Sequence, residues 1–530
     1  MDRMPNQSRT SDRASNSLAE LLCALSFATG LGFGGHIEHG LGSASLGLHL
    51  ADVLELPAEE REAVFYGALL KDVGCTACSA GLAAFWPDAE EKPAMLSDVI
   101  LIDPSKISEM LGWLSTYLRP DVHLPQRLAR LVPFLLQCGP IVRELMRSHC
   151  EVAELFARQL GFPEDVQLTL RFQWERWDGK GMAYGLKAEA IPRPARLLHL
   201  AQVLDLSYRF GGPETTRAMA LEKRGTRFDP VGVDAFLRLV ARDDFWSEFE
   251  AQTTQSALLA RCPATRARQI EKDRVEQVCE VLGDFIDLKT REDWHHSRAV
   301  AEIALEMGQS LGLPAGELRK LRCSALVHDL GKAALPIGIL TKGTQRSESE
   351  EETFRLHPHY TQRILERVEA LRDLVPAAAS HHEWVDGRGY HRQLSGEQIP
   401  LHGRVLAVAN VYARHLQLQG GQPNPAEILR VMHAGVGSQF DSACYDALAR
   451  VVSGQKGEAV LPAQSKRDNL TEREREILRL LVQGHNTPQI ARILTISKKT
   501  VEHHLTHIYT KIGVSSRTAA VIYAVQQGLI

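Results

Sequence analysis

The sequence predicts an all-α protein in which two tandem copies of one helical domain are followed by a small four-helix domain. Three observations predict this fold class: a long internal repeat, apolar residues spaced three and four apart, and capping signals around short helices near the C-terminus. Alternating β-branched runs, which are typical of strands, are scarce. With 530 residues the chain is too long for a single core, so several domains are expected.

An internal repeat accounts for most of the first 450 or so residues. Residues 39–75 align with residues 296–332 without a gap, at an offset of 257. Residues 149–205 align with residues 357–413 at an offset of 208. The first copy therefore carries about fifty extra residues between its two aligned blocks, and both copies are expected to share one helical fold.

The repeat and the changes in composition divide the chain into six segments. Residues 453–469 are polar and contain Gly and Pro, which is the composition of a linker. The expected segments are a disordered N-terminus (1–16), the first copy (17–242), a helical connector (243–285), the second copy (286–452), the linker (453–469) and the four-helix domain (470–530).

Charge and composition restrict the partners and the compartment. Residues 466–530 hold ten Lys/Arg and five Asp/Glu, a net charge of +5, whereas the whole chain carries −4. A basic module on an acidic body indicates a polyanionic partner for that module. The chain has no run of eighteen apolar residues, no signal peptide and no framework spacing among its nine cysteines. We therefore expect a cytoplasmic protein without a membrane partner.

The second copy concentrates side chains that bind metals. Imidazole and carboxylate ligands suit iron, manganese or zinc, and a shared carboxylate allows a paired site that activates water and clamps a phosphoester. A spacing of four places Glu292 and His296 on one helix face, and His328 and Asp329 are expected within a helix. Scattered, solvated histidines are the alternative, which fits His295, His359 and His391. The candidate ligands are Glu292, His296, His328, Asp329, His357, His381 and His382.

At these residues the second copy resembles the HD-GYP family of phosphodiesterases. The resemblance spans about 290–450 and rests on VHDLGK (327–332) and on HHEWVDGRGY (381–390) with IPLHGRVLAVAN (399–410). It implies an all-α domain that binds two or more divalent metals and hydrolyses cyclic di-GMP, with the seven candidates as metal ligands. It also implies that Asp329 and Lys332 are catalytic residues, the first bridging the metals and the second contacting the substrate phosphate.

Two departures from the family pattern leave two hypotheses open. The family's later aspartate ligand falls at Asn410, whose amide oxygen can bind a metal but brings no charge. The family's name motif reads Gly389-Tyr390-His391, so a histidine replaces the proline of the substrate loop. The second copy is therefore either an active phosphodiesterase or an inactive domain that senses cyclic di-GMP or another phosphate-containing nucleotide.

The first copy carries few of these ligands. Only His39, Asp72 and His149 survive, and Lys71 places a cation where a metal would lie, which disfavours metal binding. We expect no catalysis there, so this copy either packs against its twin or binds another ligand. The alignment equates nine positions of the first copy with nine positions of the second. The residues of the first copy are Gly35, His39, Lys71, Asp72, Cys75, His149, Gln173, Trp174 and Gln202. In the same order, the residues of the second copy are Glu292, His296, His328, Asp329, Lys332, His357, His381, His382 and Asn410.

The last sixty or so residues carry the start signals of short helices. Thr471 with Glu474 predicts a capping box, and Thr487 as N-cap with Pro488 predicts a short second helix. A third helix is expected over about 498–512, with Val501, Leu505 and Ile508 toward the core. A helix, a tight turn and a second helix are what a reader of the DNA major groove needs.

This stretch closely resembles the LuxR/FixJ-type helix-turn-helix over its whole length, in LTEREREIL (470–478), IARILTISKKTVEHHL (490–505) and KIGVSSRTAAV (511–521). The resemblance implies a bacterial transcription regulator that binds double-stranded DNA with residues 499–512 in the major groove. It further implies a homodimer formed through the last helix, at about 517–527. The residues expected to face DNA are Lys498, Lys499, Thr500, His503, His504 and Lys511.

Overall fold

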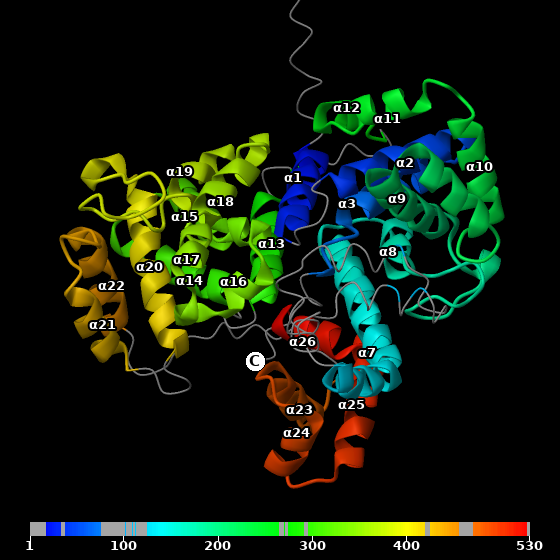
Figure 1. The fold of residues 1–530 in the computed structure, drawn as a ribbon. Coiled ribbons are helices and arrows are strands. Elements are labelled where there is room, and N and C mark those ends of the chain that lie inside the picture. The colour runs from blue at the N-terminus through cyan, green and yellow to red at the C-terminus, as the bar shows by residue number, and fades with distance from the viewer. Residues whose placement is uncertain are drawn as a thin grey trace, which may run out of the picture.

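The computed structural model of the chain is all-helical in the part that it describes, which confirms the predicted fold class (Figure 1). None of the helices in this part combines the length and the apolar character that crossing a bilayer requires. The described residues are 17–32, 38–75, 124–263, 274–290, 295–418, 424–454 and 470–526, with the single positions 101, 109, 112 and 270.

The two halves of the repeat fold into equivalent helices, in two bodies that lie side by side (Figure 1). In the first three pairs, both helices begin at positions that the sequence alignment equates. The pairs are α2 (His39–Val53) with α14 (His296–Ser310), α3 (Ala58–Leu70) with α15 (Ala315–Val327), α9 (Arg193–Glu222) with α20 (Leu401–Leu418), and α10 (Pro230–Val240) with α22 (Ser442–Gly454).

One ion pair recurs in both copies at equivalent positions. Arg196 Nη1 lies 2.7 Å from Asp229 Oδ2 in the first copy, and Arg404 Nη1 lies 2.7 Å from Asp441 Oδ2 in the second. Each pair ties the start of one long helix to the segment before the last helix of its copy. The sequence repeat is therefore also a repeat of contacts.

Two helices lie between the two bodies (Figure 1). Helix α1 (Ser17–Gly32) packs on η5 (Leu330–Ala334) and α18 (His357–Leu365) of the second copy. Helix α13 (Val275–Thr290) contacts α7 (Leu124–Gln159) of the first copy. The largest hydrophobic core contains buried residues of both copies, so the first copy does pack against its twin.

Shorter helices complete the two bodies. In the first half they are α8 (Glu164–Arg171), η3 (Ala188–Ala190), α11 (Phe245–Gln252) and α12 (Gln255–Ala260). In the second half they are α16 (Ile337–Thr341), η6 (Gly343–Gln345), α17 (Glu348–Phe354), η7 (Glu369–Leu374), α19 (Val375–Ala378), η8 (Gly396–Gln398) and α21 (Pro425–His433).

The C-terminal module has its own hydrophobic core and lies below the two bodies in the view of Figure 1. Val501, Leu505 and Ile508 are buried in this core, as predicted. The predicted capping box of Thr471 and Glu474 is also present. The module's helices are α23 (Glu472–Val482), α24 (Thr487–Ile493), α25 (Lys498–Ile512) and α26 (Arg517–Gln526).

The predicted N-cap of the second module helix was wrong by one residue. Asn486, and not Thr487, caps α24, because its side chain accepts the Gln489 N–H at 3.0 Å. The Gln489 side chain in turn accepts the Asn486 N–H at 2.8 Å. Both residues at the boundary are good N-caps, and the reciprocal bond with Gln489 selects the first of them.

Candidate metal centre and DNA-binding surface

Asp329 lies at the centre of the second copy and is 3% exposed. Its Oδ2 lies 3.2 Å from His328 Nε2 and 3.9 Å from His296 Nε2. Its Oδ1 lies 3.3 Å from His357 Nε2 and 3.5 Å from His381 Nε2. Each oxygen of one carboxylate therefore faces its own pair of imidazoles.

A tight turn carries the central carboxylate. Helix α15 ends at Val327, so His328 and Asp329 follow the helix and do not lie within it, which corrects the sequence prediction. A Cβ at Gly331 would lie 1.9 Å from the His357 carbonyl oxygen, so only glycine lets η5 approach α18 this closely. This close packing brings His357 to Asp329.

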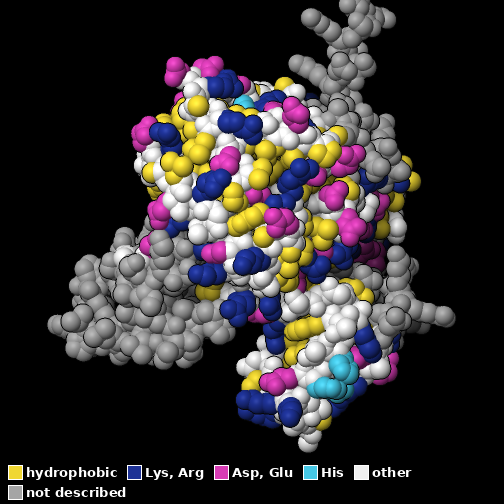
Figure 2. All heavy atoms as spheres, turned by 90° about the vertical axis from the view of Figure 1, so that its right-hand side faces the viewer, with side chains coloured by type: hydrophobic (Ala, Val, Ile, Leu, Met, Phe, Trp, Pro, Cys, Tyr) yellow, Lys and Arg dark blue, Asp and Glu magenta, His cyan; other side chains and the backbone are white. Residues whose placement is uncertain are grey.

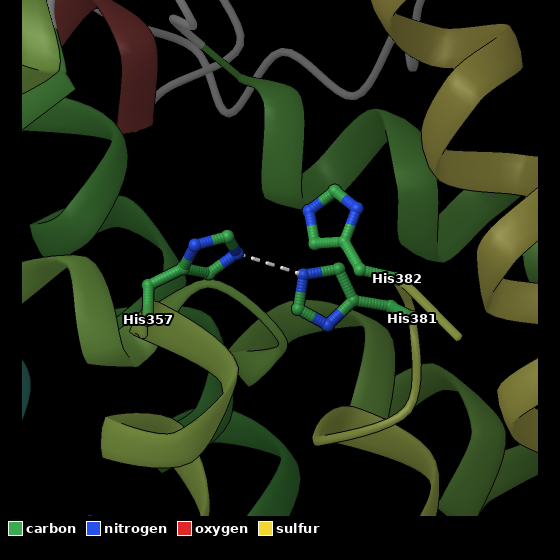
Figure 3. A group of neighbouring side chains, drawn as sticks. All are labelled: His357, His381 and His382. Atoms are coloured by element: carbon green, nitrogen blue, oxygen red, sulfur yellow. Dashed lines mark hydrogen bonds between the residues drawn. The ribbon is translucent and has the colours of Figure 1, made fainter. Parts of the chain in front are cut away.

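Backbone carbonyls fix the orientation of three imidazoles. The Nδ1 atoms of His328, His357 and His381 each donate to the carbonyl oxygen three residues earlier, at 2.6, 2.8 and 2.7 Å. Because Nδ1 carries the proton, each Nε2 presents a lone pair toward Asp329. Figure 3 shows the rings of His357 and His381 facing each other, with their Nε2 atoms 3.1 Å apart.

These lone pairs converge on positions that suit a cation. Burial lowers the pKa of His381 and holds the pKa of His357 well below its usual range, so both rings are neutral. The pKa of His382 is also held well below its usual range, by burial and by the other two rings. Neutral nitrogens with lone pairs facing each other are unfavourable unless a positive charge lies between them.

Two groups of ligand atoms in the described residues could each hold one metal ion. Within each group, the ligand atoms lie within 4.8 Å of one another. Asp329 belongs to one group and lies against two members of the other. The groups are His296, His328 and Asp329, and His357, His381 and His382.

Two buried polar atoms of this centre also indicate that it can hold a metal ion. His328 Nε2 and Asp329 Oδ1 are buried and have no hydrogen-bond partner among the described residues. Burial by itself would raise the pKa of Asp329, but the positive charge next to it, the Lys332 ammonium included, outweighs burial and holds this pKa well below its usual range. A buried, ionised carboxylate beside the neutral imidazoles of His357 and His381 fits a divalent metal.

Asn410 and Lys332 both lie at this centre. Asn410 Oδ1 is 2.8 Å from His296 Nε2, so the amide lies at the position expected from the sequence. Lys332, 4% exposed, places its Nζ 2.7 Å from Asp329 Oδ2. The ammonium of Lys332 thus occupies one side of the carboxylate that the histidines surround.

The argument that placed Glu292 on one helix face with His296 was wrong. Helix α14 begins at His296, and His295 before it adopts a left-handed conformation with φ 62°. The helix therefore does not extend back to residue 292. Glu292 itself lies outside the described residues.

Glu383 holds the loop that follows the paired histidines, and the sequence argument missed this role. Its carboxylate, 1% exposed, accepts the N–H groups of Arg392 at 2.7 Å and Leu394 at 2.9 Å. In the first copy the equivalent Glu175 accepts the Tyr184 N–H at 2.6 Å. A glutamate at the same repeat position in both copies was the signal that could have revealed it.

In the first copy, an ion pair and a hydrogen bond occupy positions that correspond to the candidate metal centre. Lys71, 1% exposed, places its Nζ 2.5 Å from Asp72 Oδ2, so an ammonium takes the position of a cation beside the carboxylate. His39 Nδ1 lies 2.6 Å from Asp205 Oδ2. Burial lowers the pKa of His149 to about 4. Gly35, the counterpart of Glu292, lies outside the described residues.

The exposed face of α25 is basic and polar. Lys498, Lys499, Thr500 and His503 are exposed, and His504 is half-buried. Figure 2 shows Lys, Arg and His side chains on the lobe that the C-terminal module forms at the lower end of the molecule. This face can contact both phosphates and base edges.

Lys511, on the same helix, is engaged in an ion pair within the module. Its Nζ lies 2.7 Å from Glu474 Oε2, the same oxygen that accepts from Thr471 in the capping box. The pair joins α25 to the start of α23. Lys511 therefore helps to hold the module together, and its contact with DNA stays a prediction.

Comparison with known families matches both parts of the chain. Residues 121–231 and 280–444 match the family described as "HD domain", and together they are more than half of the chain. This chain belongs to the HD domain family. Residues 468–524 match "Bacterial regulatory proteins, luxR family". The HD domain matches fall in both copies of the repeat, so this HD domain protein is a tandem with a luxR-family module.

Characterised relatives of this HD domain protein include phosphodiesterases. The chain is 26% identical to 3'3'-cGAMP-specific phosphodiesterase 3 of Vibrio cholerae, over 82% of this chain and 95% of that protein. It is 34% identical to the cyclic di-GMP phosphodiesterase response regulator RpfG of Xanthomonas campestris, over 28% of this chain and 41% of that protein.

A solved structure shares the fold of this HD domain protein. The crystal structure of a cyclic GMP-AMP-specific phosphodiesterase of V. cholerae, V-cGAP3, superposes with a TM-score of 0.57 at 24% identity. The superposition covers 84% of this chain and all of that one. The tandem arrangement of the two copies is therefore a fold that a solved protein also has.

Proposed function

We propose that this HD domain protein is a transcription regulator whose second copy is a metal-dependent phosphodiesterase for a cyclic dinucleotide. The observation that carries the proposal is the convergence of imidazole lone pairs on the two oxygens of Asp329. The luxR-family module supplies DNA binding. We propose the same division of the chain into segments as the sequence predicts.

We propose that the centre holds two divalent metals. His296, His328 and Asp329 would bind the first, His357, His381 and His382 the second, and Asp329 would be shared. Asn410 and Glu292 would complete the ligands. Iron, manganese and zinc all accept imidazole and carboxylate. When bound, these metals supply the Lewis-acid chemistry for attack of water on a phosphoester.

The chain's own residues would bind and orient the substrate. Lys332 is a buried ammonium next to Asp329, and it would hold a phosphate oxygen of the substrate at the centre. Glu383 fixes the loop of Tyr390 and His391 through two backbone bonds, so the loop keeps one shape despite the lost proline. The loop would form one wall around the nucleotide.

The substrate class follows from the relatives. Those compared above act on 3'3'-cGAMP or cyclic di-GMP, which are cyclic dinucleotides with two phosphodiester bonds. We propose the same class here. The relative that matches 82% of this chain is named as specific for 3'3'-cGAMP. Both 3'3'-cGAMP and cyclic di-GMP therefore belong in the test.

One observation favours a second candidate, a domain that binds the nucleotide without cleaving it. Asn410 brings a neutral oxygen to His296, where a carboxylate would add a charge. A less charged centre binds divalent metals more weakly.

We also propose that two chains pair through α26, as the sequence predicts. In this structure α26 contacts α7 of its own chain.

Hydrolysis of the two dinucleotides by the purified full chain tests the proposal. With Mn²⁺, Fe²⁺ or Zn²⁺, the wild type should cleave at least one of them, and Asp329→Ala should not. Asp72→Ala, the equivalent change in the first copy, should keep full activity. Activity that appears only in Asn410→Asp would establish the sensor and reject the enzyme. Activity that survives Asp329→Ala would place the chemistry elsewhere.

A further inference from the structure

Helix α26 of the DNA-binding module is bound at its N-terminus by a buried carboxylate of the first copy. Glu151 on α7 is 4% exposed and accepts the N–H groups of Ser515 at 2.9 Å and Ser516 at 3.0 Å. It also accepts both serine hydroxyls, that of Ser516 at 2.7 Å. A carboxylate at a helix N-terminus is favoured by the helix dipole and by charge-assisted hydrogen bonds.

An apolar contact extends this binding to the second copy. Ile522 of α26 is buried together with Val152 of α7 and Leu288 of α13. A cavity of about 30 Å³ remains among the three helices, and His295 lies in its wall. Figure 1 shows α26 where the module meets the two bodies. The three helices are therefore incompletely packed at this point, as in a domain contact that can open.

Helix α13 connects this contact to the metal centre. The residue after Leu288, Lys289, is 1% exposed and donates its Nζ to three carbonyl oxygens of the η5 segment. The distances are 3.2 Å to Lys332, 2.7 Å to Ala333 and 2.7 Å to Leu335. Lys332 in turn holds Asp329 Oδ2 at 2.7 Å. Contacts therefore run without a break from α26 through α13 to the central carboxylate.

We propose that docking of α26 and metal binding at Asp329 are coupled equilibria that oppose each other. The inference rests on the proposed metal centre. In the docked arrangement Lys332 holds one oxygen of Asp329, so a metal at that oxygen has to displace the ammonium and shift the segment to which Lys289 is tied. The shift reaches α26 through Leu288. Filling of the HD centre thereby releases the DNA-binding module from the body.

Amide hydrogen exchange of the full chain, with and without Mn²⁺, tests the coupling. The amides of Ser515 and Ser516 donate to Glu151, so their exchange reports docking directly. In the wild type, Mn²⁺ should speed their exchange at least about fivefold, the lower range of measured couplings. Glu151→Gln should show fast exchange already without Mn²⁺ and no further change. Ile522→Ala, which removes the apolar half of the contact, should behave in the same way.

The controls separate docking from folding and from the metal centre. Glu164→Gln changes an exposed glutamate of the same copy and should match the wild type. The amides of α23 should stay protected in every variant, which shows that the module is folded. Because the coupling is reciprocal, Glu151→Gln should bind Mn²⁺ more tightly than the wild type does. The factor should equal the one by which Mn²⁺ speeds the serine exchange of the wild type. A wild type that binds Mn²⁺ with unchanged serine exchange overturns the coupling alone, whereas a wild type that binds no Mn²⁺ overturns the metal centre as well.

Discussion

At the residue scale, a neutral side chain, Asn410, lies at the proposed metal centre. Its oxygen lies 2.8 Å from His296 Nε2, close enough to join the ligands of the first metal. Replacing the amide with a carboxylate adds a negative charge to a buried site that already holds Asp329. Because divalent metals prefer charged oxygens, the change should strengthen binding more than its small change in shape would suggest.

Asn410→Asp should therefore lower the dissociation constant for Mn²⁺ by about tenfold, or about 1.4 kcal/mol. Titration calorimetry on the metal-free protein measures this directly. Gln202→Asp makes the equivalent change in the first copy, where Lys71 already neutralises Asp72, and should leave the affinity unchanged. A weaker affinity in Asn410→Asp would mean that residue 410 is not at a metal.

At the residue scale, the sequence predicted which side chains lie at the site better than it predicted their contacts. The proposed ligands after residue 295 do converge, because the fold brings the turn after α15, the start of α18 and the turn after α19 to one centre. The shared helix face of Glu292 and His296 was wrong, because the left-handed His295 interrupts the helix. The pairing of Lys511 with Glu474 was missed, because it joins two helices that are far apart in sequence.

Among the elements, α25 carries the proposed DNA contacts. Lys499→Ala or His503→Ala should weaken binding to a specific site by about 1–3 kcal/mol if a base contact is lost. Fluorescence anisotropy with labelled duplexes measures the change. Glu502→Ala, an exposed change on the same helix, serves as the control and should not weaken binding. Unchanged affinity in both test variants would remove these residues from the recognition surface.

The ion pair between Glu474 on α23 and Lys511 on α25 predicts how the stability of the module depends on pH. Burial by itself would raise the pKa of Glu474, but Lys511 and Thr471 outweigh it and lower this pKa to about 2. A carboxyl whose pKa is lowered on folding stabilises the module above its unfolded value of about 4.5, and this stabilisation is lost as the pH falls toward 2.

Thermal unfolding of residues 466–530 between pH 6 and pH 2 checks this expectation. The midpoint should fall through that window in the wild type and much less in Glu474→Gln, which cannot titrate there. The fragment has its own hydrophobic core and is suited to the measurement. Equal losses in the two proteins would show that other carboxyls govern acid unfolding.

Helix boundaries were largely predictable because their signals are local. The third module helix was expected at about 498–512 and spans Lys498–Ile512. Its N-cap Ser497 and the left-handed Gly513 after its end act within a few residues of the boundary. The N-cap of α24 was misplaced because two adjacent residues, Asn486 and Thr487, carry the same signal.

On the scale of the whole molecule, the repeat predicted two copies but not how they meet. The shared core, the placement of α1 and α13 between the bodies and the docking of α26 all depend on contacts between distant segments. Glu151 and Ser515 are 364 residues apart, and no local pattern announces their contact. Such contacts are decided by the surfaces that remain after each copy has folded.

The central claim is that the second copy holds metals at Asp329 and the first copy holds none. Elemental analysis of the full chain, stripped of metal and refilled in turn with Mn²⁺, Fe²⁺ and Zn²⁺, tests it most directly. The wild type and the double variant Lys71→Ala/Asp72→Ala should retain two metals per chain. The double variant His328→Ala/Asp329→Ala should retain none. A wild type that takes up none of the three metals would contradict the account.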